Sequence, residues 1–260
     1  MHCSFPPGEN DNPLEAPDEA NLQRARYEIA HRFLAGRGLE VGAGARPFPL
    51  PQGAEAIYGD IRDEVGLTKF FGTSAVTCGE KIDAQTLNGI PDESVDFLIS
   101  AHVIEHLRDP LGAIVQGLRV LKRSKPFILV VPEMRLTFDR HRPETTIEHV
   151  LRDFTDGGES TCFQAYEEHL RYVHPYLTGE TYVEAEIQRQ ATENARRWRE
   201  FDVHFHAWTR AGFEGLLKAA ANISPFRVEE IVAVANENIF VLCKARWRPR
   251  FSFRPIRRRK

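Results

Sequence analysis

The stretch Gly38-Leu-Glu-Val-Gly-Ala-Gly-Ala45 constrains the fold more than any other part of the chain. It combines a short apolar strand, an acid inside the strand end and two closely spaced glycines. A turn through glycines lets the backbone approach a ligand closely, because no side chain intervenes. A phosphate-binding turn does not need the acid Glu40, whereas a ligand with a cationic or amino-acid-like part would. The pattern therefore favours a nucleoside ligand with a positively charged part over a pyrophosphate.

The bulk composition is that of a single large domain. The 260 residues are 42% hydrophobic and 27% charged, which is ordinary for a soluble globular protein. The longest apolar runs, such as Phe127–Val131, are far shorter than the ~20 residues of a membrane span. The first residues lack the basic and apolar regions of a secretory signal, and the four cysteines show no CxxC spacing. We therefore expect a cytoplasmic protein with free thiols.

Charge is distributed unevenly along the chain. Nine Lys or Arg and no acid occur from Lys244 onward, whereas residues 1–243 carry 25 basic and 37 acidic side chains, a balance of −12. A basic tail is typical of a solubilising terminus, and its aromatic residues leave peripheral contact with an anionic membrane open. We expect an irregular segment over 1–17, one domain over 18–245 and this tail over 246–260. No oligomeric state is predicted.

Short apolar runs alternate with helical segments from residue 18 onward. One helix is expected over Asp18–Leu34, and another begins at Asp109-Pro110, where proline suits the first turn. Strands are expected over 39–41, 56–58, 81–82, 95–100 and 127–131, followed by an antiparallel hairpin of 226–234 and 239–243. This α/β alternation predicts a mostly parallel sheet with helices on both faces.

The stretch from about 134 to 203 differs from the rest because it is polar, aromatic and mostly helical in pattern. Thr145-Thr-Ile-Glu148 resembles a capping box, after which His149 and Asp153 fall four residues apart on one helix face. The stretch lies between the fifth strand and the last helix. We therefore expect it to form a helical lid or substrate-binding insertion.

Polar residues follow each of the first four predicted strands. In an open α/β sheet, ligands bind beyond the carboxyl ends of the strands. Asp60 comes about twenty residues after the glycine turn, where a carboxylate can accept both hydroxyls of a ribose. The predicted cofactor-binding residues at these strand ends are Glu40, Gly42, Gly44, Asp60, Asp83, Ala84 and His102.

Two further stretches belong with these residues: Pro91-Asp-Glu-Ser-Val-Asp-Phe-Leu-Ile-Ser-Ala-His-Val-Ile-Glu-His106 and Arg119-Val-Leu-Lys122. Together they resemble class I methyltransferases that depend on S-adenosylmethionine (SAM), of the type 11 kind. The likeness covers about 35–132 in detail. It implies a Rossmann-like, mostly parallel seven-stranded sheet with an antiparallel last strand and a helical insertion after the fifth. It further implies that the glycine turn approaches the methionine part of SAM, that Asp60 holds the ribose and that Asp83 contacts the adenine. The family's third glycine is replaced by Ala45.

The stretches Val131–His149 and Asp202–Thr209 resemble a narrower group, bacterial methyltransferases associated with the assembly of surface polysaccharides or glycans. This resemblance implies O-methylation of a sugar or related small acceptor. In such a reaction the protein aligns the reactants and removes the hydroxyl proton. Imidazole titrates near neutral pH, so the candidate bases are His206, His149, His106 and His204, of which the first three are favoured in that order. Asp139 and Asp153 are candidates to orient a base or bind a divalent ion.

The motif His102-Val-Ile-Glu-His106 matches the inverted zinc-protease pattern, but Asp109-Pro110 ends its helix too soon for that fold. A similar Glu-x-x-Glu-His site looks metal-binding in quinone-biosynthesis O-methyltransferases. His102 replaces the first of those acids, so a divalent metal is not favoured here. Two alternative functions stay open. One is methyl transfer to a quinone, lipid or nucleic acid, of which nucleic acid is the least expected, and the other is a non-catalytic SAM-binding scaffold.

Overall fold

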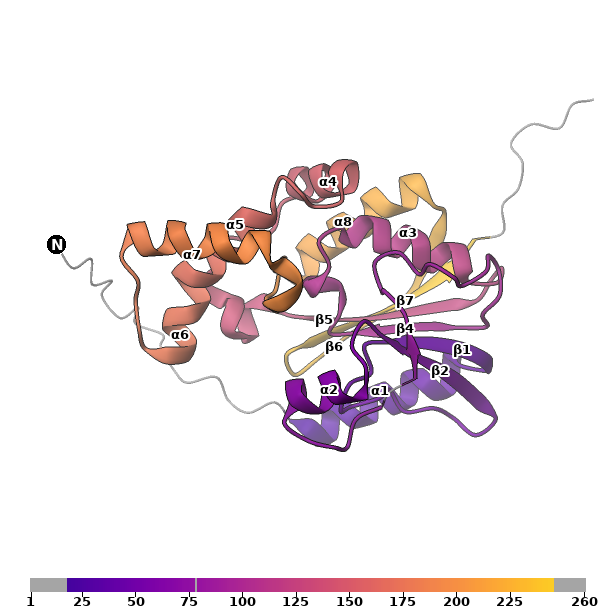
Figure 1. Cartoon of the computed structure of the whole chain (residues 1–260). Helices are drawn as coiled ribbons and strands as arrows, with labels where there is room; N and C mark the ends of the chain where they lie inside the picture. The colour runs from indigo at the N-terminus through magenta and orange to yellow at the C-terminus, as the bar shows by residue number, and fades with distance from the viewer. Residues whose placement is uncertain (1–17, 78, 246–260) are drawn as a thin grey trace, which may run out of the picture.

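The computed structural model describes residues 18–77 and 79–245, which are built around one seven-stranded sheet (Figure 1). The strands run in the spatial order β3-β2-β1-β4-β5-β7-β6, and β7 is antiparallel to both of its neighbours. The other pairings are parallel. Their bounds are β1 (Gly36–Val41), β2 (Ala54–Asp60), β3 (Glu80–Lys81), β4 (Leu98–Ala101), β5 (Pro126–Pro132), β6 (Phe226–Val234) and β7 (Glu237–Lys244). The predicted fold class is confirmed.

Helices cover both faces of this sheet. Helix α1 (Glu19–Phe33) lies on one face, while α3 (Pro110–Val120) and α8 (Arg210–Ile223) lie on the other (Figure 1). Helix α2 (Glu64–Phe71) follows β2. The short helical turns are η1 (Ile104–His106), η2 (Met134–Leu136), η3 (Phe138–His141), η4 (His169–Val173) and η5 (Trp198–Glu200). The expected irregular segment over 1–17 and the basic tail over 246–260 lie outside the described residues.

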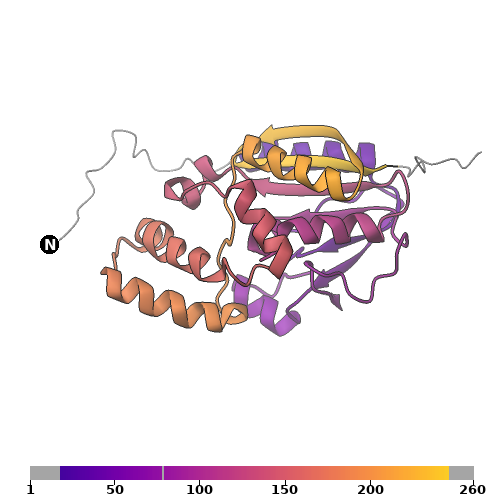
Figure 2. The same ribbon diagram turned by 90° about the horizontal axis from the view of Figure 1, so that it is seen from above.

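Four helices fall between β5 and α8, where the sequence predicts a helical insertion. They are α4 (Ile147–Asp156), α5 (Cys162–Glu168), α6 (His174–Thr178) and α7 (Glu184–Arg196). Seen from above, α5, α6 and α7 form a lobe beyond one end of the sheet (Figure 2). This lobe has a small apolar core of its own, which includes Tyr166, Ile187 and Phe205. We call residues 134–203 the insertion from here on.

The main core is divided into two layers by the sheet. Leu111 of α3 and Phe213 of α8 pack in one apolar cluster with strand residues such as Leu129. Ile29 of α1 packs in the other with Ile128, so alternate residues of β5 face opposite layers. Every residue of β5 is buried, as expected of a strand covered on both faces.

Several predicted strand boundaries differ from the structure, by three residues or fewer. Val95, expected in the fourth strand, makes only an isolated bridge to Leu121, and β4 begins at Leu98. The turn of the last hairpin is shorter than expected, because Glu237 and Asn238 belong to β7 and are buried. Ala235 supports the tight turn with a φ of 49°. Within the described residues, none of the helices has the length and apolar character needed to cross a membrane.

Candidate active site

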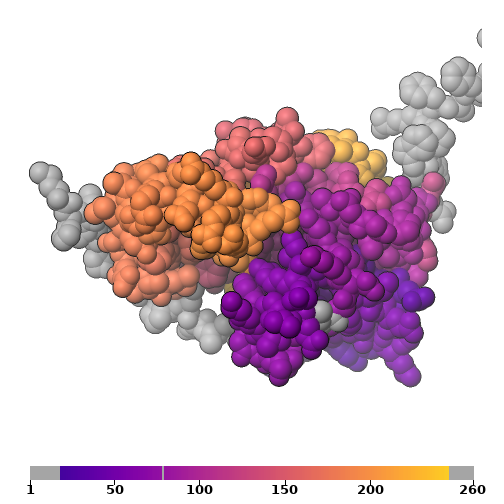
Figure 3. All heavy atoms as spheres, in the orientation of Figure 1, coloured from indigo at the N-terminus to yellow at the C-terminus, as the bar shows by residue number. Residues whose placement is uncertain are grey.

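A hollow of about 740 Å³ lies where the carboxyl ends of the strands meet the insertion. One wall comes from the turns after β1, β2, β3 and β4, and the other comes mainly from residues 198–205. In the space-filling view, the surface of α2 lies beside that of the insertion (Figure 3). This placement agrees with the general position of ligands in open α/β sheets. We call the hollow the strand-end pocket.

The glycine turn after β1 brings bare backbone to the strand-end pocket. Gly42 lines the pocket with a φ of 69°, and its amide donates to the carbonyl of Gly59 at 2.8 Å. A Cβ on Gly42 would lie 2.3 Å from Cγ2 of Val103, so no larger residue fits. Gly44 has a φ of 53° and packs against Phe71 without lining the pocket. Gly42 therefore supplies the close approach, and Gly44 shapes the turn.

Asp60, Asp83 and Ala84 also line the strand-end pocket, at the ends of β2 and β3. Oδ1 of Asp60 accepts a hydrogen bond from the backbone amide of Arg62 at 2.8 Å. Burial raises the pKa of Asp60, although the Arg62 amide and charge oppose that shift. Oδ1 of Asp83 accepts from the amide of Gln85 at 2.9 Å. Each carboxylate is thus held by a hydrogen bond from the backbone amide two residues later, and both carboxylates line the strand-end pocket.

Glu40 does not line the strand-end pocket, although the sequence groups it with the cofactor-binding residues. Its side chain is fully buried behind the glycine turn, and its Oε1 accepts from the amide of Phe48 at 2.8 Å. Burial raises the pKa of Glu40 to about 7, against the opposing effects of the Phe48 amide and the Arg26 charge. Glu40 therefore holds the loop that follows the turn.

His102 lies in the pocket wall directly after β4, within a cluster of charged side chains. Its φ of 54° is unusual for a residue with a side chain and aims the ring at Glu237, whose Oε1 lies 2.6 Å from Nε2. Burial alone would lower the pKa of His102, but its close contacts with the carboxylates of Glu105 and Glu237 raise it to about 9. Glu237 also binds Arg26, whose Nε donates to Oε2 at 3.1 Å. The positive charges of Arg26 and His102 thus balance the carboxylates of Glu105 and Glu237 beside the glycine turn.

His106 also lines the strand-end pocket, on the side of the insertion. Its Nδ1 lies 2.7 Å from Oδ1 of Asp202. Burial alone would lower the pKa of His106, but the hydrogen bond to Asp202 and the charge of Glu105 outweigh it and raise the pKa. The ring of His204 packs edge-on at 4.5 Å, and Nδ1 of His204 lies 2.5 Å from Oδ2 of Asp139. Each imidazole is therefore oriented by a carboxylate.

Aromatic and guanidinium groups surround this part of the strand-end pocket. Phe70 and Phe71 come from α2, and Trp198, Phe201 and Phe205 come from the opposite wall. The guanidinium of Arg108 lies 4.7 Å from the centre of the Trp198 ring. The Nη2 of Arg62 donates to Oδ2 of Asp202 at 3.0 Å and joins the two walls. Planar apolar faces and charged donors thus meet next to His106.

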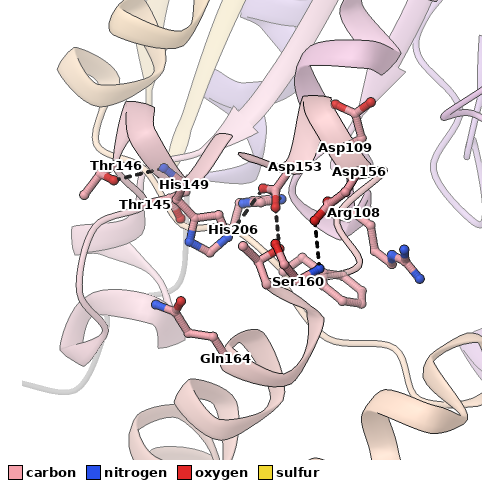
Figure 4. A network of polar contacts seen from close by, with 12 residues as sticks. Arg108, Asp109, Thr145, Thr146, His149, Asp153, Asp156, Ser160, Gln164 and His206 are labelled. Atoms are coloured by element: carbon pink, nitrogen blue, oxygen red, sulfur yellow. Dashed lines mark hydrogen bonds and ion pairs between the residues drawn. The ribbon is translucent and has the colours of Figure 1, made fainter. Parts of the chain in front are cut away.

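His206 and His149, the first two candidate bases, lie outside the lining of the strand-end pocket. They are buried in a separate group with Asp153, at the level of α4 (Figure 4). The amide of His206 donates to the carbonyl of Glu105 at 3.1 Å, so this group lies behind the η1 segment. Of the three candidate bases, the structure brings only His106 together with Gly42, Asp60, Asp83, Ala84 and His102.

Sequence reasoning does not identify Arg26, Glu237 or Asp202 as parts of this site. Arg26 lies within a helix that precedes every motif, and Glu237 falls in a stretch predicted to be a turn. Asp202 appears only as the first residue of a motif. The one available signal is its position two residues before His204, in a stretch where polar and apolar residues alternate.

Comparison with known proteins agrees with this architecture. Residues 39–129 match a family model described as a methyltransferase domain. A solved SAM-dependent methyltransferase from Methanosarcina mazei is similar at 17% identity and a TM-score of 0.50, with 84% of this chain and 98% of that chain covered. Another, from Aquifex aeolicus, is similar at 15% identity and a TM-score of 0.44, with 90% and 93% covered. No curated protein matches the chain. Residues 39–129 therefore match a methyltransferase domain, and the chain is an enzyme whose cofactor is S-adenosylmethionine.

Proposed function

We propose that the protein transfers a methyl group from SAM to a hydroxyl oxygen of a sugar or related small acceptor, with His106 as the general base. The observation that carries the proposal is the 2.7 Å contact between His106 and Asp202 in the same pocket as Gly42 and Asp60. His106, the base in this proposal, and Asp60, the carboxylate that would bind the nucleoside, thus line the same pocket.

The residues of the strand-end wall fit SAM. One oxygen of Asp60 accepts a hydrogen bond from a backbone amide, and the residue still lines the pocket. A carboxylate that binds the two hydroxyls of a ribose has to line the pocket in this way. Gly42 offers backbone without a side chain, and Ile82 and Ala84 offer apolar surface beside Asp83. In this proposal, Asp60 holds the ribose, and Asp83 and Ala84 lie next to the adenine. Gly42 and His102 lie next to the methionine part. When bound, SAM supplies an electrophilic methyl group on its sulfonium.

His106 removes the proton of the acceptor hydroxyl in this proposal. Asp202 binds Nδ1, which fixes the ring so that Nε2 is the basic nitrogen. The raised pKa makes the neutral ring a stronger base, while the acidic neighbours stabilise the imidazolium that forms. General-base help of this kind contributes roughly 10²–10⁴-fold to rate.

The walls near His106 support a saccharide or similar acceptor. Flat rings such as Trp198 and Phe201 can stack against the apolar face of a sugar, while Arg108 and Arg199 can donate to its hydroxyls. The pocket volume of about 740 Å³ lies within the range of small-ligand sites, and it has to hold both cofactor and acceptor. This argues for a small acceptor or for the end of a longer glycan.

Methyl transfer to separate panels of saccharides, quinones and oligonucleotides tests the proposal, with mass spectrometry of the products. The proposal expects O-methylated saccharide from the wild type and a rate lower by ~10²-fold or more in His106→Gln. His31→Gln, on the exposed surface of α1, serves as the matched control and should keep the wild-type rate. Product only from another panel, or full activity in His106→Gln, would refute the assignment.

A further inference from the structure

We propose that His149, Asp153 and His206 bind a divalent transition-metal ion, of which Zn²⁺ is the best match, as a structural brace behind the strand-end pocket. We call these three residues the buried triad. The inference is independent of the acceptor and of the base proposed above, because no member of the triad lines the pocket.

The three side chains of the buried triad converge on one point (Figure 4). Nε2 of His149 lies 3.4 Å from Oδ2 of Asp153, and Nε2 of His206 lies 3.5 Å from the same oxygen. Zinc bonds of about 2.1 Å at a tetrahedral angle place two ligand atoms about 3.4 Å apart. Two of the three ligand pairs therefore already have the spacing that a tetrahedral ion requires, and all three ligand atoms lie within 4.8 Å of one another. A water molecule would complete the coordination.

Three polar atoms of the triad have no hydrogen bond of normal geometry to any part of the chain that the structure describes. Among the described residues, Oδ2 of Asp153 and both ring nitrogens of His206 are buried without a hydrogen bond of normal geometry. The exposed fractions of His149, Asp153 and His206 are only 6%, 0% and 1%. Groups buried in this way are costly unless something compensates them. A cation bound between the three side chains would compensate Oδ2 of Asp153 and one nitrogen of each imidazole.

The ligand types of the buried triad favour a transition-metal ion. Two imidazoles and one carboxylate suit Zn²⁺ and similar ions better than Mg²⁺ or Ca²⁺, which prefer oxygen ligands.

Each member of the triad is oriented by a second contact. The amide of His149 donates to Oγ1 of Thr146 at 3.2 Å, which fixes the start of α4. Oδ1 of Asp153 accepts from the hydroxyl of Thr161, which leaves Oδ2 for the histidines. The ring of His206 stacks on Trp208 with centres 5.1 Å apart, and the carbonyls of Leu107 and Arg108 act on the same ring. Such outer contacts are typical of metal sites.

A metal here would tie two parts of the molecule together. His149 and Asp153 belong to α4, while His206 belongs to the segment that enters α8. Leu107 and Arg108, which act on His206, line the strand-end pocket. The ion would therefore brace one wall of the pocket from behind.

Metal analysis of the full chain, without a histidine tag, tests this inference. Apo protein is titrated with Co²⁺ or Zn²⁺, and binding is followed by the visible bands of Co²⁺ and by melting temperature. We expect about one equivalent to bind and to raise the melting temperature. Asp153→Asn and His149→Gln should each weaken binding by about 100-fold or more, and His106→Gln should bind as the wild type does.

Two results would overturn the inference: a wild type that binds no ion, or an ion lost in His106→Gln and retained in Asp153→Asn. If neither triad variant folds, anomalous diffraction from wild-type crystals soaked with Zn²⁺ decides the question. A peak between His149, Asp153 and His206 supports the site. A peak elsewhere, or none, refutes it.

Discussion

Glu40 is a buried acid in the middle of the sheet, and its ionisation opposes folding. Its pKa is about 7 in the folded chain against 4.5 as the ordinary value, so folding favours the protonated form. The associated stability is fully present below pH 4.5 and is lost as the pH rises through about 7. Glu40→Gln keeps the size and an acceptor for the Phe48 amide. We expect it to raise the free energy of unfolding by ~1–3 kcal/mol at about pH 8.

Urea denaturation of Glu40→Gln and the wild type at about pH 8 and pH 4 measures this effect. The difference between the two proteins should shrink at the lower pH, where both side chains are neutral. A variant that is less stable than the wild type at about pH 8 would show that the charged form of Glu40 is the one that the fold needs.

Asp202 is a positioning residue for His106, and its effect should be visible in the dependence of kcat on pH. A general base works only when it is deprotonated, so activity should rise with pH through the raised pKa of His106. Asp202→Asn removes the charge that raises this pKa. We expect the acid limb of kcat to move to lower pH, with a loss of plateau rate smaller than that of His106→Gln. An unmoved limb in Asp202→Asn would argue against the pairing, whatever the change in rate.

Helix α4 is the element that carries two members of the buried triad, and its N-terminus depends on one cap. Oγ1 of Thr146 accepts the amide hydrogen of His149 at 3.2 Å. Thr146→Ala should lower the free energy of unfolding by about 0.5–2 kcal/mol, whereas Thr146→Ser keeps the acceptor and should lose much less. Chemical denaturation of both variants measures the difference. Equal losses would mean that the methyl group, and not the hydroxyl, stabilises this position.

The elements of the sheet could be predicted from the sequence because their signals are local. Alternation of apolar runs and helices places the strands, and the glycine turn and the spacing to Asp60 place that residue at a strand end. The contacts that complete the site are not local. Asp202 meets His106 across 96 positions, and Glu237 meets Arg26 across 211. The choice between His206 and His106 depends on these long-range contacts, which no spacing in the sequence encodes.

Glu40 illustrates the same limit within the glycine motif itself. Its place at the end of β1 is predictable, but the direction of its side chain is not. The loop that ends at Phe48 folds back over the turn and takes up Oε1, which leaves Gly42 and Asp60 to face the pocket. A motif residue can therefore shape a site from behind without contacting the ligand.

At the scale of the whole molecule, the strand-end pocket divides between two parts of the chain. The sheet supplies Gly42, Asp60 and Asp83, and the opposite wall supplies Asp202 and the aromatic residues. The ion pair between Arg62 and Asp202 connects the two walls. Under the proposed function, the sheet holds the cofactor and the opposite wall receives the acceptor, with His106 between them.

Calorimetric titration of SAM into the wild type and Asp60→Asn tests this division of roles most directly. Loss of the charged acceptor should weaken SAM binding by about 10-fold or more, since hydrogen bonds to charged groups contribute about 1.5–3 kcal/mol. Asp92→Asn, on the exposed surface outside the pocket, is the control and should bind as the wild type does. Equal affinity in Asp60→Asn and the wild type, or no binding by the wild type, would contradict the placement of the cofactor against the sheet.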